Sequence, residues 1–120
     1  MGTSAKPSFD RGIWGELIEL FGHEGVTEML GALQRDLPLQ QQQLGAAIAA
    51  EDRGSLKRTA HSLRGVALQF GAESLAQRCG DIEQSVAGST PTAQIGLDAT
   101  RMLETYAALL RHLQDALHDA

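Results

Sequence analysis

Residues 55–70, SLKRTAHSLRGVALQF, decide the fold class of this 120-residue chain. Apolar side chains recur through them at successive spacings of 4, 3, 4 and 3 residues, and these are Leu56, Ala60, Leu63, Ala67 and Phe70. Such spacing aligns side chains on one face of an α-helix, whose period is about 3.6 residues. We therefore predict an amphipathic helix here, with Ser55 as its N-cap and Gly71 as the glycine that closes it.

The same period recurs on both sides of this helix. Apolar stripes indicate further helices over 10–21, 24–36, 38 to about 50, 75–86 and 103–117. Gly22 ends the first of them, and Pro38 either opens a new helix at its first turn or kinks a longer one. Short connections between helices favour antiparallel neighbours packed at shallow angles. We therefore expect an all-α fold, an antiparallel four-helix bundle with an additional N-terminal helix.

Composition agrees with this fold class and excludes several classes of function. Only 4% of the residues are aromatic, and 120 residues make one domain, too small for a catalytic core plus a cofactor domain. The net charge of −5, from 15 acidic and 10 basic residues, argues against nucleic-acid binding. Neither G-x-G-x-x-G nor G-x-x-x-x-G-K-[ST] occurs, so we expect no nucleotide site.

The remaining bulk features suggest a cytoplasmic protein. Cys79 is the one cysteine, and it lies on an apolar helical stripe, where a buried structural thiol is expected rather than a nucleophile. No run of about 20 apolar residues occurs, so no direct membrane contact is expected. Residues 1–8 are small, polar and without pattern, which predicts a disordered tail or a remnant of cloning. The bundle domain is assigned to residues 9–120.

His61 lies on the outer face of its predicted helix. At about 100° per residue, its side chain points roughly 140° away from the centre of the apolar stripe. Lys57 and Arg64 flank it on one side and Arg58 on the other, within residues 53–64, which hold four basic residues and no acidic one. Neighbouring cations favour the neutral, nucleophilic imidazole and attract a phosphoryl group.

Two further residues complete this face. Gly65 and Leu68 lie almost in line with His61 on the helical wheel. A mid-helix glycine costs about 1 kcal/mol relative to alanine, and we interpret it as leaving the approach to the imidazole open. Arg53, in the preceding turn, is expected to contribute to solubility alone. From the wheel alone, an ordinary exposed histidine on a charged surface remains an equal alternative.

The other histidines do not predict a metal site. His112 and His118 are six residues apart, so they do not share a helix face as a pair of metal ligands would. His23 lies at the start of a predicted helix. No metal or intrinsic cofactor is therefore expected.

Residues 60–72, AHSLRGVALQFGA, closely resemble the histidine-containing phosphotransfer (HPt) domains of multistep two-component signalling. The family pattern continues through Leu75, Cys79, Ile82 and Glu83, and a weaker resemblance covers nearly the whole chain. One departure is Arg64, because the family commonly has lysine three residues after the histidine. Arginine keeps the positive charge but presents a planar fork in place of a compact ammonium.

The resemblance implies a role for each residue on this face. His61 would accept and donate the phosphoryl group through Nε2, and Glu83 would hydrogen-bond Nδ1 and so orient the imidazole. Arg64 and Lys57 would assist electrostatically. The residues expected to dock a partner are Gly65, Leu68 and Arg58.

The resemblance also implies the partners. The chain would be a monomeric phosphoryl carrier rather than an enzyme, exchanging phosphate with response-regulator receiver domains, with a histidine kinase as a further candidate partner. Mg²⁺ would belong to the receiver. The domain could also be the cytoplasmic C-terminal part of a membrane-anchored hybrid kinase.

Two other interpretations remain, the phosphoacceptor domain of a chemotaxis-type kinase and a non-phosphorylated helical adaptor bundle. The dimerisation module of a histidine kinase is disfavoured. Its histidine is typically followed by an acidic residue and then, a few positions on, by proline, whereas here Ser62 follows and the next proline is Pro91.

Overall fold

Four helices make up the fold, fewer than the six predicted segments, because the first three segments lie in one helix, and the last helix begins eleven residues before its predicted stripe at 103. They are α1 (Arg11–Ala49), α2 (Arg53–Gln69), α3 (Glu73–Ala87) and α4 (Thr92–His118). The computed structural model describes residues 8–119, and this part of the chain contains no strand. The predicted all-α class is confirmed. The predicted tail lies, except for Ser8, outside the described residues.

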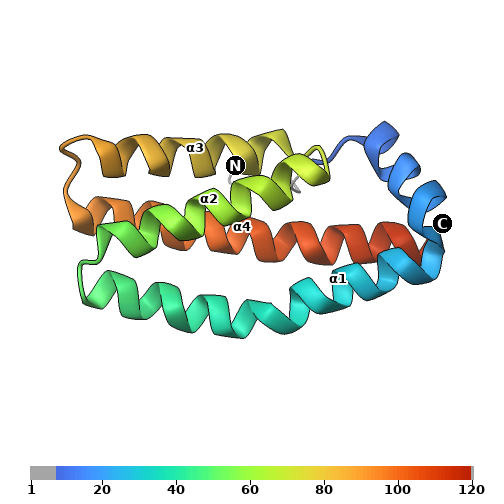
Figure 1. Ribbon diagram of the computed structural model, residues 1–120, viewed down its shortest axis with the longest axis horizontal. Helices are drawn as coiled ribbons and strands as arrows, with labels where there is room; N and C mark the ends of the chain where they lie inside the picture. Colours follow the sequence, from blue (N-terminus) through green and yellow to red (C-terminus); the bar gives the residue numbers. More distant parts are fainter. Residues whose placement is uncertain (1–7, 120) are drawn as a thin grey trace, which may run out of the picture.

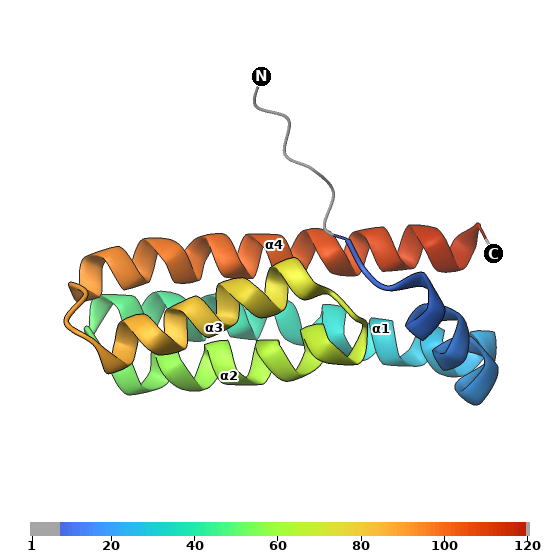
Figure 2. The same cartoon turned by 90° about the horizontal axis from the view of Figure 1, so that it is seen from above.

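The helices alternate in direction, so each is antiparallel to the next along the chain (Figure 1). α2 packs against α1, α3 and α4, and α1 packs against α4, while α1 and α3 occupy opposite corners. In Figure 2, α4 runs along the whole length of the bundle. The apolar stripe of each helix faces the middle, and Leu63, Phe70, Ile95 and Leu113 are fully buried there. The expected four-helix bundle is thus confirmed.

The additional N-terminal helix is the first part of α1. Gly22, with φ of 73° and ψ of 166°, interrupts the helical backbone, so the preceding residues turn across the end of the bundle where α4 ends (Figure 1). The ring Nε2 of His23 lies 3.0 Å from the carbonyl oxygen of Leu117, which ties this turn to α4. Pro38 lies inside α1, so of the two predicted alternatives it belongs to a longer helix.

The predicted N-cap of α2 is wrong by one turn. Asp52, not Ser55, caps the helix, which begins at Arg53. The Asp52 carboxylate accepts hydrogen bonds from the backbone N–H of Ser55 at 3.1 Å and from its hydroxyl at 2.7 Å. These bonds lower the pKa of Asp52. Both residue types are good caps, and Asp52 takes the position because Ser55 serves as its donor in the first turn.

The hinge between α2 and α3 is built around Gly71, as predicted. Its φ of 66° is left-handed, a conformation that glycine adopts without a steric penalty. The backbone N–H of Gly71 donates to Leu68 and that of Ala72 donates to Ala67, the paired bonds of a Schellman motif. This tight turn returns the chain so that α3 lies antiparallel beside α2.

Candidate functional site

The pairing of α2 with α3 brings His61 and Glu83 together. His61 lies ten residues before Gly71 and Glu83 twelve residues after it, so the two stand at similar heights on antiparallel helices. Nδ1 of His61 is 3.2 Å from Oε2 of Glu83. The imidazole is 74% exposed and the carboxylate only 20% exposed. The predicted outward direction of His61 and its predicted neighbour are therefore both found.

The Glu83 carboxylate has few other hydrogen-bond partners. Its Oε2 has one hydrogen-bond partner in the described chain, His61, and its Oε1 is buried without a partner. A buried carboxylate oxygen that lacks a partner loses hydration that it would have in water. In the tautomer with its proton on Nδ1, His61 would direct that N–H at this carboxylate. Nε2 lies at the other side of the ring, away from Glu83.

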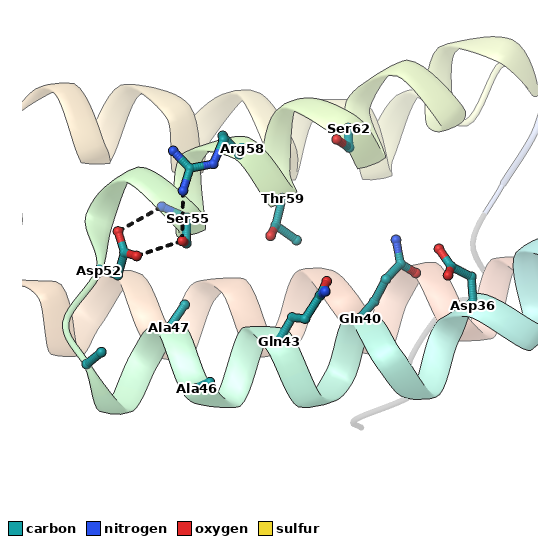
Figure 3. A pocket seen from close by; sticks show the side chains of 11 residues that line it. Asp36, Gln40, Gln43, Ala46, Ala47, Asp52, Ser55, Arg58, Thr59 and Ser62 are labelled. Carbon is teal, nitrogen blue, oxygen red and sulfur yellow. Dashed lines mark hydrogen bonds between the residues drawn. The ribbon is translucent and has the colours of Figure 1, made fainter.

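The cationic residues predicted around His61 do lie near it on α2, but their side chains point in different directions. Arg58 donates from its Nη2 to the hydroxyl of Ser55 at 2.9 Å, and this pairing holds it on the α1 side of α2 (Figure 3). Arg64 is close enough to Cys79 of α3 to oppose the rise in the pKa of that thiol. Lys57, one turn before His61, is exposed. Positive charge therefore borders the imidazole on both sides.

The surface beyond His61 is open. A Cβ added at Gly65 would meet no atom within 4 Å, and Leu68, one turn further, is 56% exposed. This placement agrees with the predicted open approach to the imidazole. An apolar side chain beside an accessible reactive group is the kind of surface that a protein partner covers.

An open groove of about 610 Å³, lined by polar side chains and alanines, runs between α1 and α2 next to this face (Figure 3). Asp36 and Gln40 line it from α1, and Arg58 and Ser62 line it from α2. Arg58 and Ser62 are the neighbours of His61 on the helix surface. The groove therefore borders the candidate site without containing the histidine.

The prediction for Arg53 is wrong, because this residue is part of the structure and not only a soluble surface group. Its two terminal nitrogens lie within hydrogen-bond distance of five oxygens, at the end of α3, in the connection that follows it and on Thr92, the first residue of α4. The acceptors lie 32 to 39 residues away in the sequence, so no helical wheel places them beside Arg53. No pattern in the sequence indicated this contact, because α1 and α2 also lack a basic residue in the last turn.

Cys79 is buried, as predicted, and burial raises the pKa of its thiol to about 11, with the Glu83 carboxylate adding to the shift. Such a thiol stays protonated at neutral pH and is a poor nucleophile. The ring of His112 packs edge-on against Phe9, with centroids 5.2 Å apart. Among residues 8–119, no three His, Cys, Asp or Glu side chains gather where they could hold a metal ion.

Comparisons with known proteins agree with this geometry. The family model described as "Hpt domain" matches residues 28–120, which is most of the chain and includes His61 and Glu83. The chain belongs to the Hpt domain family. The expected membership is thereby confirmed, and neither the chemotaxis-type kinase nor the adaptor alternative is favoured.

The Hpt domain also has a solved structural relative. The crystal structure of histidine-containing phosphotransfer protein B (HptB) from Pseudomonas aeruginosa PAO1 superposes with a TM-score of 0.78. At 23% sequence identity it covers 97% of this chain and 99% of its own, so it shows a shared fold. No curated protein matches the sequence significantly. In the described part of this Hpt domain, no helix is both long and apolar enough to span a bilayer.

Proposed function

We propose that this Hpt domain carries a phosphoryl group on Nε2 of His61, received from the aspartate of one receiver domain and passed to that of another. Hpt domains are phosphoryl carriers of two-component phosphorelays that act with receiver domains and kinases, and membership of the family supports the proposal. The observation that carries it is the exposed imidazole whose Nδ1 lies 3.2 Å from the Glu83 carboxylate.

The chemistry follows from the two ring nitrogens. With its proton on Nδ1, neutral His61 has a free lone pair on Nε2, which attacks the phosphorus of an aspartyl phosphate. The N–P bond forms as the O–P bond breaks, and the aspartate leaves as a carboxylate. The imidazole then carries a positive charge, and its Nδ1–H donates to Glu83, which stabilises the phosphorylated ring. The reverse sequence delivers the phosphoryl group to the second receiver.

Transfer of a phosphoryl group depends mostly on in-line positioning and on neutralising charge. In this proposal Arg64 and Lys57 contribute positive charge beside His61, while the Mg²⁺ belongs to the receiver and the domain needs no cofactor of its own. Gly65 and Leu68 would form the flat surface on which the receiver docks, with Arg58 at its edge. This division of labour suits a single small domain.

The first test is the site of phosphorylation. The domain is incubated with a phosphorylated receiver or with phosphoramidate, and the label is analysed for the acid lability and base stability of phosphohistidine. We expect His61→Gln to abolish labelling, and His118→Gln, which removes another exposed histidine, to leave it unchanged. Full labelling of the His61→Gln variant would show that the phosphate is carried elsewhere.

The second test concerns the docking face. Gly65→Gln should slow transfer from a phosphorylated receiver, because the added side chain stands in the open space beside His61. Gly45→Gln is a matched control, since Gly45 is also an exposed helical glycine with no atom within 4 Å of an added Cβ. Equal transfer rates for the two variants, with helix content retained, would rule out the steric role of Gly65.

A further inference from the structure

The guanidinium of Arg53, at the start of α2, contacts the end of α3 and the start of α4 at one end of the bundle. Nη2 donates to the carbonyl oxygens of Ser85, Val86 and Gly88 at 3.1–3.2 Å. Nη1 donates to the carbonyl of Thr90 at 2.8 Å and to the hydroxyl of Thr92 at 3.1 Å. The start of α2, the end of α3 and the start of α4 meet at this point (Figure 1).

Arg53 acts as the C-terminal cap of α3. The last carbonyl groups of a helix have no partner within the helix, and they carry the negative end of its dipole. α3 has no basic side chain in its last turn, and Ser85 and Val86 belong to that turn. The carbonyl of Ser85 already accepts from the backbone N–H of Gly88, and the positive charge supplied by α2 adds a donor for the carbonyls of Val86 and Gly88, which opposes fraying of this turn.

The capped turn begins next to Glu83. Glu83 precedes Ser85 by two residues, so the turn held by Arg53 is the one that follows the carboxylate paired with His61. Arg53 and His61 lie on the same helix, α2, eight residues apart. The Arg53 contacts therefore restrain the end of α3 relative to the helix that carries His61, both against sliding and against fraying.

We propose that Arg53 is a positioning residue for His61, which holds the end of α3 so that the Glu83 carboxylate stays against Nδ1. The inference rests on the proposed function and deepens it, because the tautomer fixed by Glu83 leaves Nε2 as the nucleophile. The half-buried guanidinium suits this task. Its planar fork reaches acceptors on α3 and α4 at once, whereas a lysine ammonium is a single point of charge.

The direct test observes the imidazole and requires no phosphate. Long-range ¹H–¹⁵N NMR spectra of His61 report the fraction of the Nδ1–H tautomer. We expect this form to dominate in the wild-type domain and to decrease in Arg53→Ala, with partial recovery in Arg53→Lys. Arg101→Ala is the matched control, because Arg101 is exposed and its side chain makes no hydrogen bond in the described chain; the tautomer should not change.

A kinetic cycle tests whether Arg53 acts through Glu83. Arg53→Ala should lower the rate of phosphotransfer by on the order of tenfold, the scale expected when a positioned group loses its geometry. The double variant Arg53→Ala/Glu83→Ala should be no slower than Glu83→Ala alone. Residues that act as one unit give such non-additive losses, whereas independent residues give additive ones.

The outcomes separate this inference from the proposed function. An unchanged His61 tautomer in folded Arg53→Ala, or additive losses in the kinetic cycle, would overturn the positioning role, whatever happens to the melting temperature. If Arg53→Ala does not fold, Arg53→Lys decides by the same tautomer measurement. Failure of the wild-type domain to accept phosphate would overturn the proposed function, while the tautomer would still decide the role of Arg53.

Discussion

Replacing Gly71 by alanine should destabilise the domain more than the addition of one methyl group suggests. Gly71 has a φ of 66°, a left-handed conformation that costs a residue with a Cβ roughly 1–2 kcal/mol. The added Cβ would also overlap the Cβ of Asp10, and it would lie 3.1 Å from the backbone nitrogen of Asp10 and 3.0 Å from Cδ1 of Ile13. Overpacking of this kind costs about 1–3 kcal/mol.

The two penalties together predict a loss of about 2–5 kcal/mol in the free energy of unfolding. Part of the loss arises because Asp10 must move away, and its backbone N–H now donates to the carbonyl of Phe70 at 3.2 Å. The N-terminal helix would then detach from the hinge between α2 and α3. Urea denaturation followed by circular dichroism measures the free energy, and the fluorescence of buried Trp14 reports on the N-terminal helix.

Gly45→Ala is the control, and its expected change in the free energy of unfolding has the opposite sign. Gly45 lies within α1, where an added Cβ meets nothing within 4 Å, so alanine should stabilise the helix by up to about 1 kcal/mol. A loss below about 1 kcal/mol for Gly71→Ala would refute the reasoning from left-handed strain and overlap. So would equal losses for the two variants, since they would show that removing glycine matters and its position does not.

Three further predictions concern stability. The Cys79 thiol, whose pKa is raised from 9.0 to about 11, holds its proton more tightly in the folded chain; it should therefore lower the free energy of unfolding by about 2 kcal/mol between pH 9 and 11. Cys79→Ala should remove this contribution and leave the smaller one of Tyr106, whose pKa burial raises to about 12. The lowered pKa of Asp52 gives stability that is present above pH 3.8 and lost below it, so Asp52→Asn should show a smaller acid-induced loss in denaturant titrations. Leu113→Ala, at a fully buried position, should cost about 2–5 kcal/mol in the same measurement, and a loss near zero would mean that the cavity had closed.

Much of the fold was predictable because local periodicity reflects burial. The stripe that predicted α2 consists of residues that are all buried, and it left His61 on the exposed side, where the structure has it. Gly22 and Gly71 were predictable as helix ends, and both have the left-handed backbone conformation that glycine adopts freely. The cap of α2 was not, since Asp52 and Ser55 are both good caps and only their mutual hydrogen bonds decide between them.

The candidate site also has a part that could be predicted from the sequence and a part that could not. The face around His61 follows from one helix, so its cations and the open Gly65 could be predicted from about 100° per residue. The pairing with Glu83 depends on how α2 and α3 pack, and it was predicted only through the resemblance to a family. Arg53 was misjudged because its acceptors are carbonyl groups at the end of another helix, and the backbone leaves no pattern of side chains to detect.

The sequence by itself therefore determined that this chain is helical, that its helical backbone is interrupted at Gly22 and Gly71, and which face of α2 presents His61. These properties arise from interactions between residues a few positions apart, and the helical period makes them visible. Only the tertiary structure decided that Arg53 caps α3 and that Glu83 stands 3.2 Å from Nδ1 of His61. Both contacts depend on the relative height of two packed helices, which is set by the hinge at Gly71 and by the core between them.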